Sequence, residues 1–108
     1  MRPMNDCIFC KISSGKMDVS FLFEDEKCVV FRDINPKAKT HLLIVPKKHI
    51  TSVADLDESD AGLVGHLFTC ARKAAEKLDL KGYNLQVNVG KDGGQEVFHL
   101  HVHLLSKF

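Results

Sequence analysis

Hydrophobic and polar residues alternate most regularly over residues 97–105, close to the end of the printed sequence. Successive side chains of a β-strand point to opposite faces, so this pattern predicts a strand with one apolar face. The other face would carry His99, His101 and His103. A solvated edge strand is the alternative interpretation, but each imidazole has two nitrogen atoms that need partners. Three histidines in this arrangement therefore favour a functional face. The apolar face would consist of Phe98, Leu100, Val102 and Leu104.

Four further segments have the composition of β-strands. They are residues 21–24, 28–31, 41–45 and 83–89. The connections at 25–27 and 90–96 are too short for crossover helices, and this favours antiparallel pairing of the strands they join.

Two other segments have the three-and-four spacing of apolar residues that is typical of an amphipathic helix. The first covers residues 7–14 and would end at Gly15, and the second covers about 59–78 with Asp57 or Ser59 as its N-cap. His66 is expected off the apolar stripe of the long helix, at the surface. The predicted fold class is α+β, with a five-stranded, mainly antiparallel sheet, one short N-terminal helix and one long helix.

The composition is that of an ordinary globular domain. The chain has 108 residues, of which 44% are hydrophobic and 27% charged, and its formal net charge is +1. This length predicts a single domain, residues 1–108. No basic stripe or block of like charge is present, so neither nucleic acid nor an anionic membrane is an expected partner. No apolar run has the length of a membrane span or a signal peptide, so a cytoplasmic location is expected.

The four cysteines fall into two groups. Cys28 and Cys70 stand apart in apolar surroundings and are expected to be core thiols. Cys7 and Cys10 form a C-x-x-C motif, which is either a redox pair or half of a metal site that needs two more ligands.

A pair of glycines, Gly93 and Gly94, comes shortly before the histidines. Glycine lets backbone N–H groups approach a ligand closely, and such groups can surround an anion. Imidazole is both a nucleophile and a proton carrier near neutral pH. Together these features predict a phosphate-binding site with chemistry at the histidines.

Six motifs of this sequence resemble those of a known protein family. Residues 99–105 match the His-φ-His-φ-His-φ-φ signature of the histidine triad (HIT) superfamily, in which φ is a hydrophobic residue. Five further motifs resemble the Hint branch, the histidine triad nucleotide-binding proteins. These motifs are Cys7-Ile8-Phe9-Cys10-Lys11-Ile12, Asp33-Ile34-Asn35-Pro36, Thr40-His41, Val45-Pro46-Lys47-Lys48-His49 and Asp92-Gly93-Gly94-Gln95. The resemblance implies a homodimer that binds purine nucleotides and hydrolyses nucleoside 5′-phosphoramidates.

The resemblance also implies roles for individual histidines. His101 would be the nucleophile that attacks the α-phosphate and becomes transiently nucleotidylated. His103 would hold the phosphate and help to protonate the leaving amine, while His99 and His41 would complete the hydrogen-bond network. No cofactor is implied for catalysis.

The nucleotide would be bound by three sets of residues. Asp33 would accept hydrogen bonds from the ribose hydroxyls, since a carboxylate offers two acceptor oxygens. The base pocket would be lined by Ile8, Phe9, Phe31 and Ile34. The phosphate would be approached by Asn88, Gly94, Glu96 and Val97. Glu96 stands where many relatives have Ser, so the side-chain hydroxyl is replaced by a carboxylate.

Some family members that keep the C-x-x-C motif add two histidines to it, and the resemblance thus implies a structural zinc site formed by Cys7, Cys10, His49 and His99. Cleavage of dinucleoside polyphosphates, nucleotidyl transfer, and a non-catalytic nucleotide- or zinc-binding interaction module are the alternative functions. The motif at residues 92–95 argues against the first two.

Overall fold

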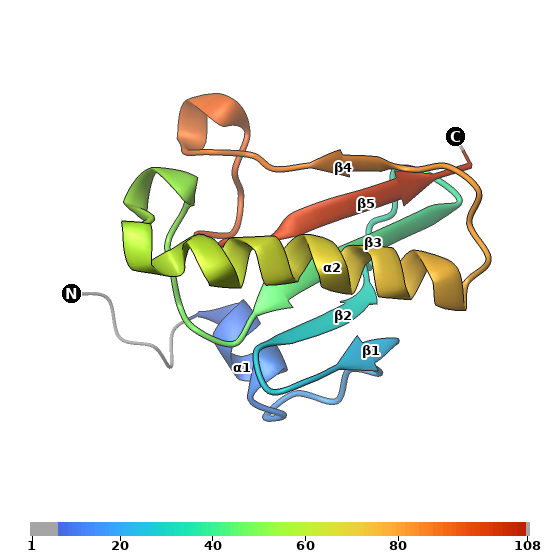
Figure 1. Ribbon diagram of the computed structural model, residues 1–108, viewed down its shortest axis with the longest axis horizontal. Helices are drawn as coiled ribbons and strands as arrows, with labels where there is room; N and C mark the ends of the chain where they lie inside the picture. Colours follow the sequence, from blue (N-terminus) through green and yellow to red (C-terminus); the bar gives the residue numbers. More distant parts are fainter. Residues whose placement is uncertain (1–6, 108) are drawn as a thin grey trace.

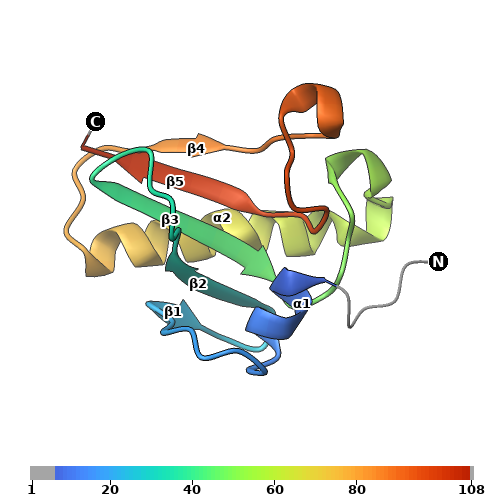
Figure 2. The same cartoon turned by 180° about the vertical axis from the view of Figure 1, so that it is seen from behind.

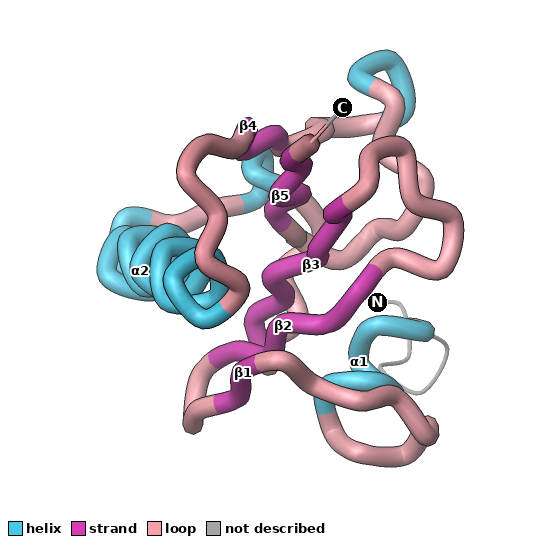
Figure 3. Tube along the Cα trace, turned by 90° about the vertical axis from the view of Figure 1, so that its right-hand side faces the viewer, coloured by secondary structure: helices cyan, strands magenta, loops and turns pink. Residues whose placement is uncertain are grey.

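The computed structural model describes residues 7–107, which form one five-stranded antiparallel sheet with helices on both faces (Figure 1). The strand order is β1-β2-β3-β5-β4. The tube view shows the long helix α2 on one side of the strands and the short helix α1 on the other (Figure 3). The predicted α+β class is confirmed, whereas the dimeric state stays a prediction. The elements are α1 (Ile8–Ser13), β1 (Phe23–Glu24), β2 (Cys28–Arg32), β3 (Thr40–Pro46), α2 (Ala61–Lys77), β4 (Asn84–Gln86) and β5 (Val102–Ser106).

The two central strands β2 and β3 are buried on both faces, because helices cover the sheet from both sides. Alternate residues therefore enter two separate cores. The core beneath α2 includes Val30, Leu42, Ile44, Leu67, Cys70, Ala71, Val102 and Leu104. The core on the opposite face, beside α1, includes Cys7, Phe9, Ile12, Val29, Phe31, Leu43 and Val45. Figure 2, the view from behind, shows α1 close to the ends of β2 and β3.

The histidine strand is shorter than predicted. The prediction of a strand over 97–105 is wrong in its first half, because β5 begins at Val102. The ladder between β3 and β5 ends at the pair Ile44–Val102, so residues 97–101 have no strand beside them there. In place of a ladder, this segment has one backbone hydrogen bond, from Leu100 N to Ile50 O at 2.7 Å. The alternation of faces still holds, because Leu100 packs beneath α2 and the ring of His101 contacts Phe9 on the other face.

Two other boundaries differ from the sequence prediction. The helix α2 begins at Ala61 and has Asp60 as its N-cap residue, whereas Asp57 precedes a separate 3₁₀ turn, Glu58–Asp60. The strand β4 has only three residues, all exposed in the single chain, instead of the half-buried strand expected over 83–89. Among the residues that the structure describes, no helix is both long enough and apolar enough to cross a membrane.

Candidate active site

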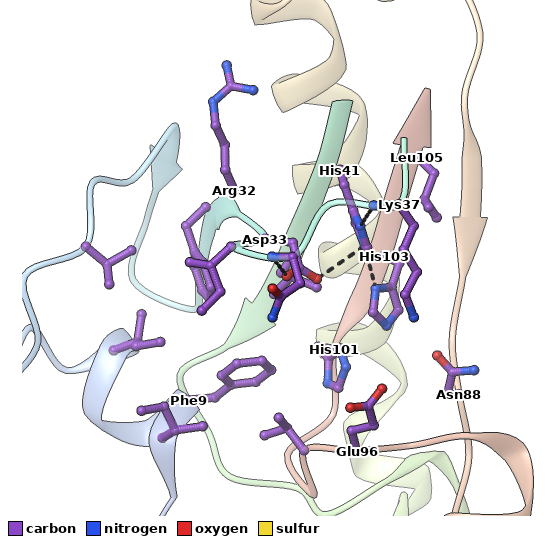
Figure 4. Close-up of a pocket in the computed structure, with 18 of the residues that line it drawn as sticks. Phe9, Arg32, Asp33, Lys37, His41, Asn88, Glu96, His101, His103 and Leu105 are labelled. Atoms are coloured by element: carbon purple, nitrogen blue, oxygen red, sulfur yellow. Dashed lines mark hydrogen bonds and ion pairs between the residues drawn. The ribbon is translucent and has the colours of Figure 1, made fainter. Parts of the chain in front are cut away.

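A cavity of about 740 Å³ opens on the face of the sheet opposite α2, within the usual size range of small-molecule sites (Figure 4). Of the residues proposed from the sequence for catalysis or nucleotide binding, all line this cavity except His99. Those that line it are Ile8, Phe9, Phe31, Asp33, Ile34, His41, Asn88, Gly94, Glu96, Val97, His101 and His103. Segments distant in the sequence therefore meet around one space.

The cavity has an apolar side and a polar side. Phe9 and its apolar neighbours from α1 and β2 line one side, and His41, His101 and His103 line the other (Figure 4). Asp33 lies between the two sides in this view. The side chain of Ile34 is 91% exposed, an unusual position for a large aliphatic residue beside a cavity. The arrangement suits a ligand with a flat apolar part and an anionic part.

His101 is fixed by its own main chain. Its Nδ1 lies 2.6 Å from the carbonyl oxygen of His99, and this acceptor requires a proton on Nδ1. The other ring nitrogen, Nε2, then carries a lone pair. The ring packs edge-on against Phe9, with centroids 5.0 Å apart, and against His103 at 4.9 Å. His101 thus has the tautomer that a nucleophile needs.

A second chain of hydrogen bonds fixes His41 and His103. The backbone N–H of Lys37 donates to His41 Nδ1 at 3.1 Å, so the proton of His41 must be on Nε2. That nitrogen lies 2.9 Å from His103 Nδ1 and donates to it. His103 therefore carries its own proton on Nε2, where it can be donated to a ligand.

The histidines of the cavity are neutral at pH 7. Burial lowers the pKa of His101 and of His41, although nearby hydrogen-bond acceptors and the Asp33 carboxylate oppose the change. Burial lowers the pKa of His103 to about 4, and the nearby His101 and His41 lower it further. A neutral imidazole is the form that can attack phosphorus.

Asp33 is held by the turn that follows β2. Its Oδ1 accepts a hydrogen bond from Asn35 N at 2.9 Å, and its Oδ2 lies 3.5 Å from His41 Nε2. One oxygen is thus used by the backbone, while the other stays at the cavity beside the histidines.

The loop before the histidines is shaped by two glycines and one buried amide. Gly90 and Gly94 have φ values of 71° and 85°, which side chains other than glycine rarely adopt. The side chain of Gln95 accepts from Gly90 N at 2.8 Å and donates to the carbonyls of Thr51 and Val97 at 2.8 and 3.0 Å. Gln95 was not among the site residues proposed from the sequence, yet it positions the loop.

The cavity also contains residues that the sequence pattern did not single out. Lys37 brings a cationic side chain to its lining, whereas the side chain of Arg32 points away from the histidines (Figure 4), and Asn35 and Gln86 bring amides. The signal that could have found Lys37 is its place in the short loop between the Asp33 turn and His41. Its positive charge favours an anionic ligand.

His99 lies in a separate cluster with Cys7, Cys10 and His49, on the same face of the sheet. The Sγ of Cys7 lies 3.3 Å from His99 Nδ1. The Sγ of Cys10 lies 3.2 Å from His49 Nδ1 and 3.5 Å from His99 Nδ1. The two Nδ1 atoms are 3.1 Å apart. All four donor atoms lie within 4.8 Å of one another.

These donors fit a tetrahedral zinc ion. With Zn–S and Zn–N bonds of ordinary length, donor atoms around zinc lie about 3.3–3.8 Å apart, close to the separations found here. His99 Nε2 donates to the carbonyl oxygen of Pro46 at 2.8 Å, so its Nδ1 presents a lone pair to the cluster. A carbonyl partner of this kind is the usual support of a histidine ligand.

Comparisons with known proteins show the family of this chain. The family described as "Scavenger mRNA decapping enzyme C-term binding" matches residues 6–108. A protein from Neisseria gonorrhoeae named Protein HitA is 41% identical over 103 residues, which cover 94% of this chain and 96% of that protein.

Solved structures are similar along nearly the whole chain. A HIT family hydrolase from Legionella pneumophila is 47% identical with a TM-score of 0.87, and the match covers 93% of this chain and 91% of that one. A histidine triad nucleotide-binding protein from Candida albicans is 33% identical with a TM-score of 0.81, covering 91% and 72%.

The half-buried, neutral ring of His103 predicts a dependence of stability on pH. Its pKa is about 4 in the folded chain, below the ordinary value of 6.5, so the unfolded chain binds more protons between these values. The free energy of unfolding should therefore fall as the pH is lowered from about 6.5 towards 4. Urea denaturation at a series of pH values measures this decrease in the free energy of unfolding. The decrease should be smaller in His103→Gln and unchanged in Gln86→Ala, a neutral neighbour on β4. Equal slopes in His103→Gln and wild type would contradict the burial of a neutral ring.

Proposed function

We propose that this chain, which belongs to the histidine triad superfamily, hydrolyses purine nucleoside 5′-phosphoramidates through a covalent nucleotidyl-histidine intermediate. The observation that carries the proposal is the bond from His101 Nδ1 to the carbonyl oxygen of His99, 2.6 Å long, because it leaves Nε2 as a nucleophile at the cavity. Similarity to HIT family hydrolases and to a histidine triad nucleotide-binding protein supports a hydrolase that acts on nucleotides.

In the first step, His101 Nε2 attacks the α-phosphorus and the P–N bond to the leaving amine breaks. His103 relays a solvent proton through Nε2 to that amine and stays neutral, and His41 Nε2–H supports His103 through the bond to its Nδ1. In the second step, water attacks the phosphorus, the bond to His101 breaks, and the proton of the water passes through His103 to solvent. The products are the amine and the nucleoside monophosphate, and both histidines return to their starting state.

The remaining cavity residues would bind the nucleotide. The apolar set of Ile8, Phe9, Phe31 and Ile34 would hold the base, and Asp33 the ribose. Backbone groups of the loop that includes Gly94 and Val97, together with the amide of Asn88, would approach the phosphate. Asn88 Nδ2 already donates to Gly93 O at 2.8 Å, so its position is fixed before a ligand enters.

Glu96 lines the same cavity as His101 (Figure 4). A fixed negative charge at this place would act against substrates that carry additional phosphates and favour those with a cationic leaving amine. This favours phosphoramidates over dinucleoside polyphosphates as substrates.

We also propose a structural zinc ion on Cys7, Cys10, His49 and His99. A closed site with two thiolates and two imidazoles stabilises the fold and supplies no open position for chemistry. It would join α1 to the segment that carries the nucleophile. No cofactor takes part in the proposed reaction steps.

A homodimer in the cytoplasm remains part of the proposal. The strand β4 lies at the edge of the sheet, and an exposed edge strand is a surface on which a second chain can pair. Leu85 on β4 and Phe68 on α2 are 38% and 41% exposed, which is high for large apolar side chains.

The function is tested by replacing the nucleophile. His101→Asn should reduce hydrolysis of adenosine and guanosine 5′-phosphoramidates by about 10³-fold or more, because no covalent route remains. Release of the free mononucleotide is the measurement. Binding of AMP or GMP should change little, since Asp33 and the loop are intact. His66→Asn, a histidine outside the cavity, is the matched control and should keep wild-type activity. Turnover of His101→Asn at the wild-type rate would exclude this mechanism, and binding without turnover in the wild type would indicate a non-catalytic module.

The zinc site is tested by metal content. The double variant Cys7→Ser, Cys10→Ser should contain one zinc ion fewer per chain than wild type and should melt at a lower temperature, because the metal stabilises only the folded chain. Elemental analysis and thermal denaturation measure the two effects. Ser14→Ala, an exposed change at the end of the same helix, should have neither effect. A double variant with unchanged zinc content and melting temperature would leave the two thiols as packing residues.

The dimer is tested by light scattering at micromolar concentration. Wild type should have twice the mass of one chain, and Leu85→Arg should shift it towards the monomer, because it places a charge on the proposed pairing edge. Val53→Arg, at a site of similar exposure (39%) outside the sheet, should leave the mass unchanged. A monomeric wild type would rule the dimer out.

A further inference from the structure

A second group of metal-binding side chains lies beneath the turn between β1 and β2, on the face of the sheet opposite the cavity. It consists of Asp25, Cys28, His66 and Cys70. One donor atom from each lies within 4.8 Å of the others. The prediction that Cys28 and Cys70 are core thiols is confirmed, because both are free and buried. The prediction that they stand apart is wrong, because they meet each other, the partly exposed His66 and the Asp25 carboxylate.

The positions follow from the local structure. His66 and Cys70 are four residues apart on α2, so their side chains lie on one face of the helix, one turn apart. Cys28 is the first residue of β2, and its side chain enters the core beneath α2. Asp25 is in the turn just before it. The cluster thus joins a hairpin to the helix that packs on it.

The Asp25 carboxylate is fixed in a defined orientation. Its Oδ1 accepts from the backbone N–H groups of Lys27 and Cys28 at 2.8 and 2.9 Å. Its Oδ2 is thereby directed towards α2, where it lies 2.7 Å from His66 Nε2 and 3.6 Å from Cys70 Sγ. Those hydrogen bonds outweigh the effect of burial, so the pKa of Asp25 lies below its ordinary value and the group is ionised.

The two thiols are an unusual pair for a hydrophobic core. Cys28 and Cys70 are both fully buried (0% exposed), and their Sγ atoms lie within 4.8 Å of each other. A buried cysteine that only fills space has hydrocarbon neighbours. Here a carboxylate and an imidazole complete the surroundings, and the side chains of His66 and Asp25 are 27% and 28% exposed, so the cluster can be reached from solvent.

We propose that Asp25, Cys28, His66 and Cys70 form a second metal site, which binds Zn²⁺ or a chemically similar divalent transition metal. Two sulfur donors, one imidazole and one carboxylate are a set of ligands that zinc accepts, and hard ions such as Mg²⁺ and Ca²⁺ do not. Binding converts both thiols to thiolates and releases their two protons to solvent. The ion would replace the hydrogen bonds that now join the four side chains.

The geometry needs only a small adjustment. Nitrogen and oxygen ligands of tetrahedral zinc lie about 3.3 Å apart, so His66 Nε2 and Asp25 Oδ2 must separate by roughly 0.6 Å from their present 2.7 Å. Both side chains are partly exposed and can make this movement. The bound site would carry one net negative charge, and Lys73 is close enough to act against the rise in pKa that burial causes at Cys70.

The expected effect of the ion is on stability and not on hydrolysis. The cluster packs beneath α2, whereas the cavity lies on the other face of the sheet. A bound ion would hold the β1–β2 turn against α2. It would therefore raise the melting temperature by about 4 °C or more and leave turnover unchanged.

The test uses the Cys7→Ser, Cys10→Ser variant, in which the other cluster cannot bind metal. Metal-free, reduced protein is titrated with Co²⁺, whose visible absorption reports tetrahedral coordination and whose ultraviolet charge-transfer absorption reports thiolate ligands. One equivalent should bind with both signatures, and Zn²⁺ should displace it. Adding Cys70→Ala should abolish both signatures, and adding His66→Gln should weaken binding at least tenfold. Asp79→Asn, an exposed carboxylate on the same domain, is the control and should bind as its parent does.

The same titration in wild type keeps the test independent of the folding of the double variant. Wild type should bind two equivalents, Cys70→Ala should reduce this to one, and His66→Gln should weaken binding of the second equivalent at least tenfold. The proposal is overturned if the double variant shows no tetrahedral Co²⁺ spectrum, or if Cys70→Ala and His66→Gln bind Co²⁺ as tightly as their parents.

Discussion

A neutral imidazole has one nitrogen that donates and one that accepts, so a hydrogen bond to either determines the chemistry of the other. The site depends on this constraint. The carbonyl of His99 holds the proton of His101 on Nδ1, and the N–H of Lys37 holds that of His41 on Nε2. The second of these bonds then determines the tautomer of His103. The three imidazoles thereby present different groups at Nε2. His101 presents a lone pair there, whereas His41 and His103 present N–H donors.

The incomplete strand is what makes the first of these bonds possible. In a regular ladder, the carbonyl of His99 would be directed towards a neighbouring strand. Because the pairing of β5 with β3 ends at Val102, the carbonyl is available to the side chain two residues further on. The break in the sheet is therefore a feature of the site.

Local patterns predicted most of the fold, and long-range contacts account for what they missed. The faces of β2, β3 and β5 and the stripe of α2 follow from periodicity, and the choice of histidines follows from residue chemistry. The start of β5 could not be predicted, because it depends on where β3 ends its pairing. Likewise, His66 and Asp25 are 41 residues apart in the chain, and no local signal indicates that they meet. Gln95 belongs to a motif quoted from the sequence, but its role in anchoring the loop follows only from its burial and its hydrogen bonds.

The two roles proposed for His99, as a zinc ligand and as a member of the hydrogen-bond network, fall on different atoms. The ring presents Nδ1 to Cys7 and Cys10 and is held through Nε2 by Pro46, whereas the main-chain carbonyl orients His101. A ligand role for the ring therefore leaves the carbonyl available. Because ring and carbonyl belong to one residue, anything that fixes the ring also limits the movement of the carbonyl. The cluster beside α1 thus limits the movement of the proposed nucleophile, His101, through the backbone, and the proposed zinc ion would not contact the substrate.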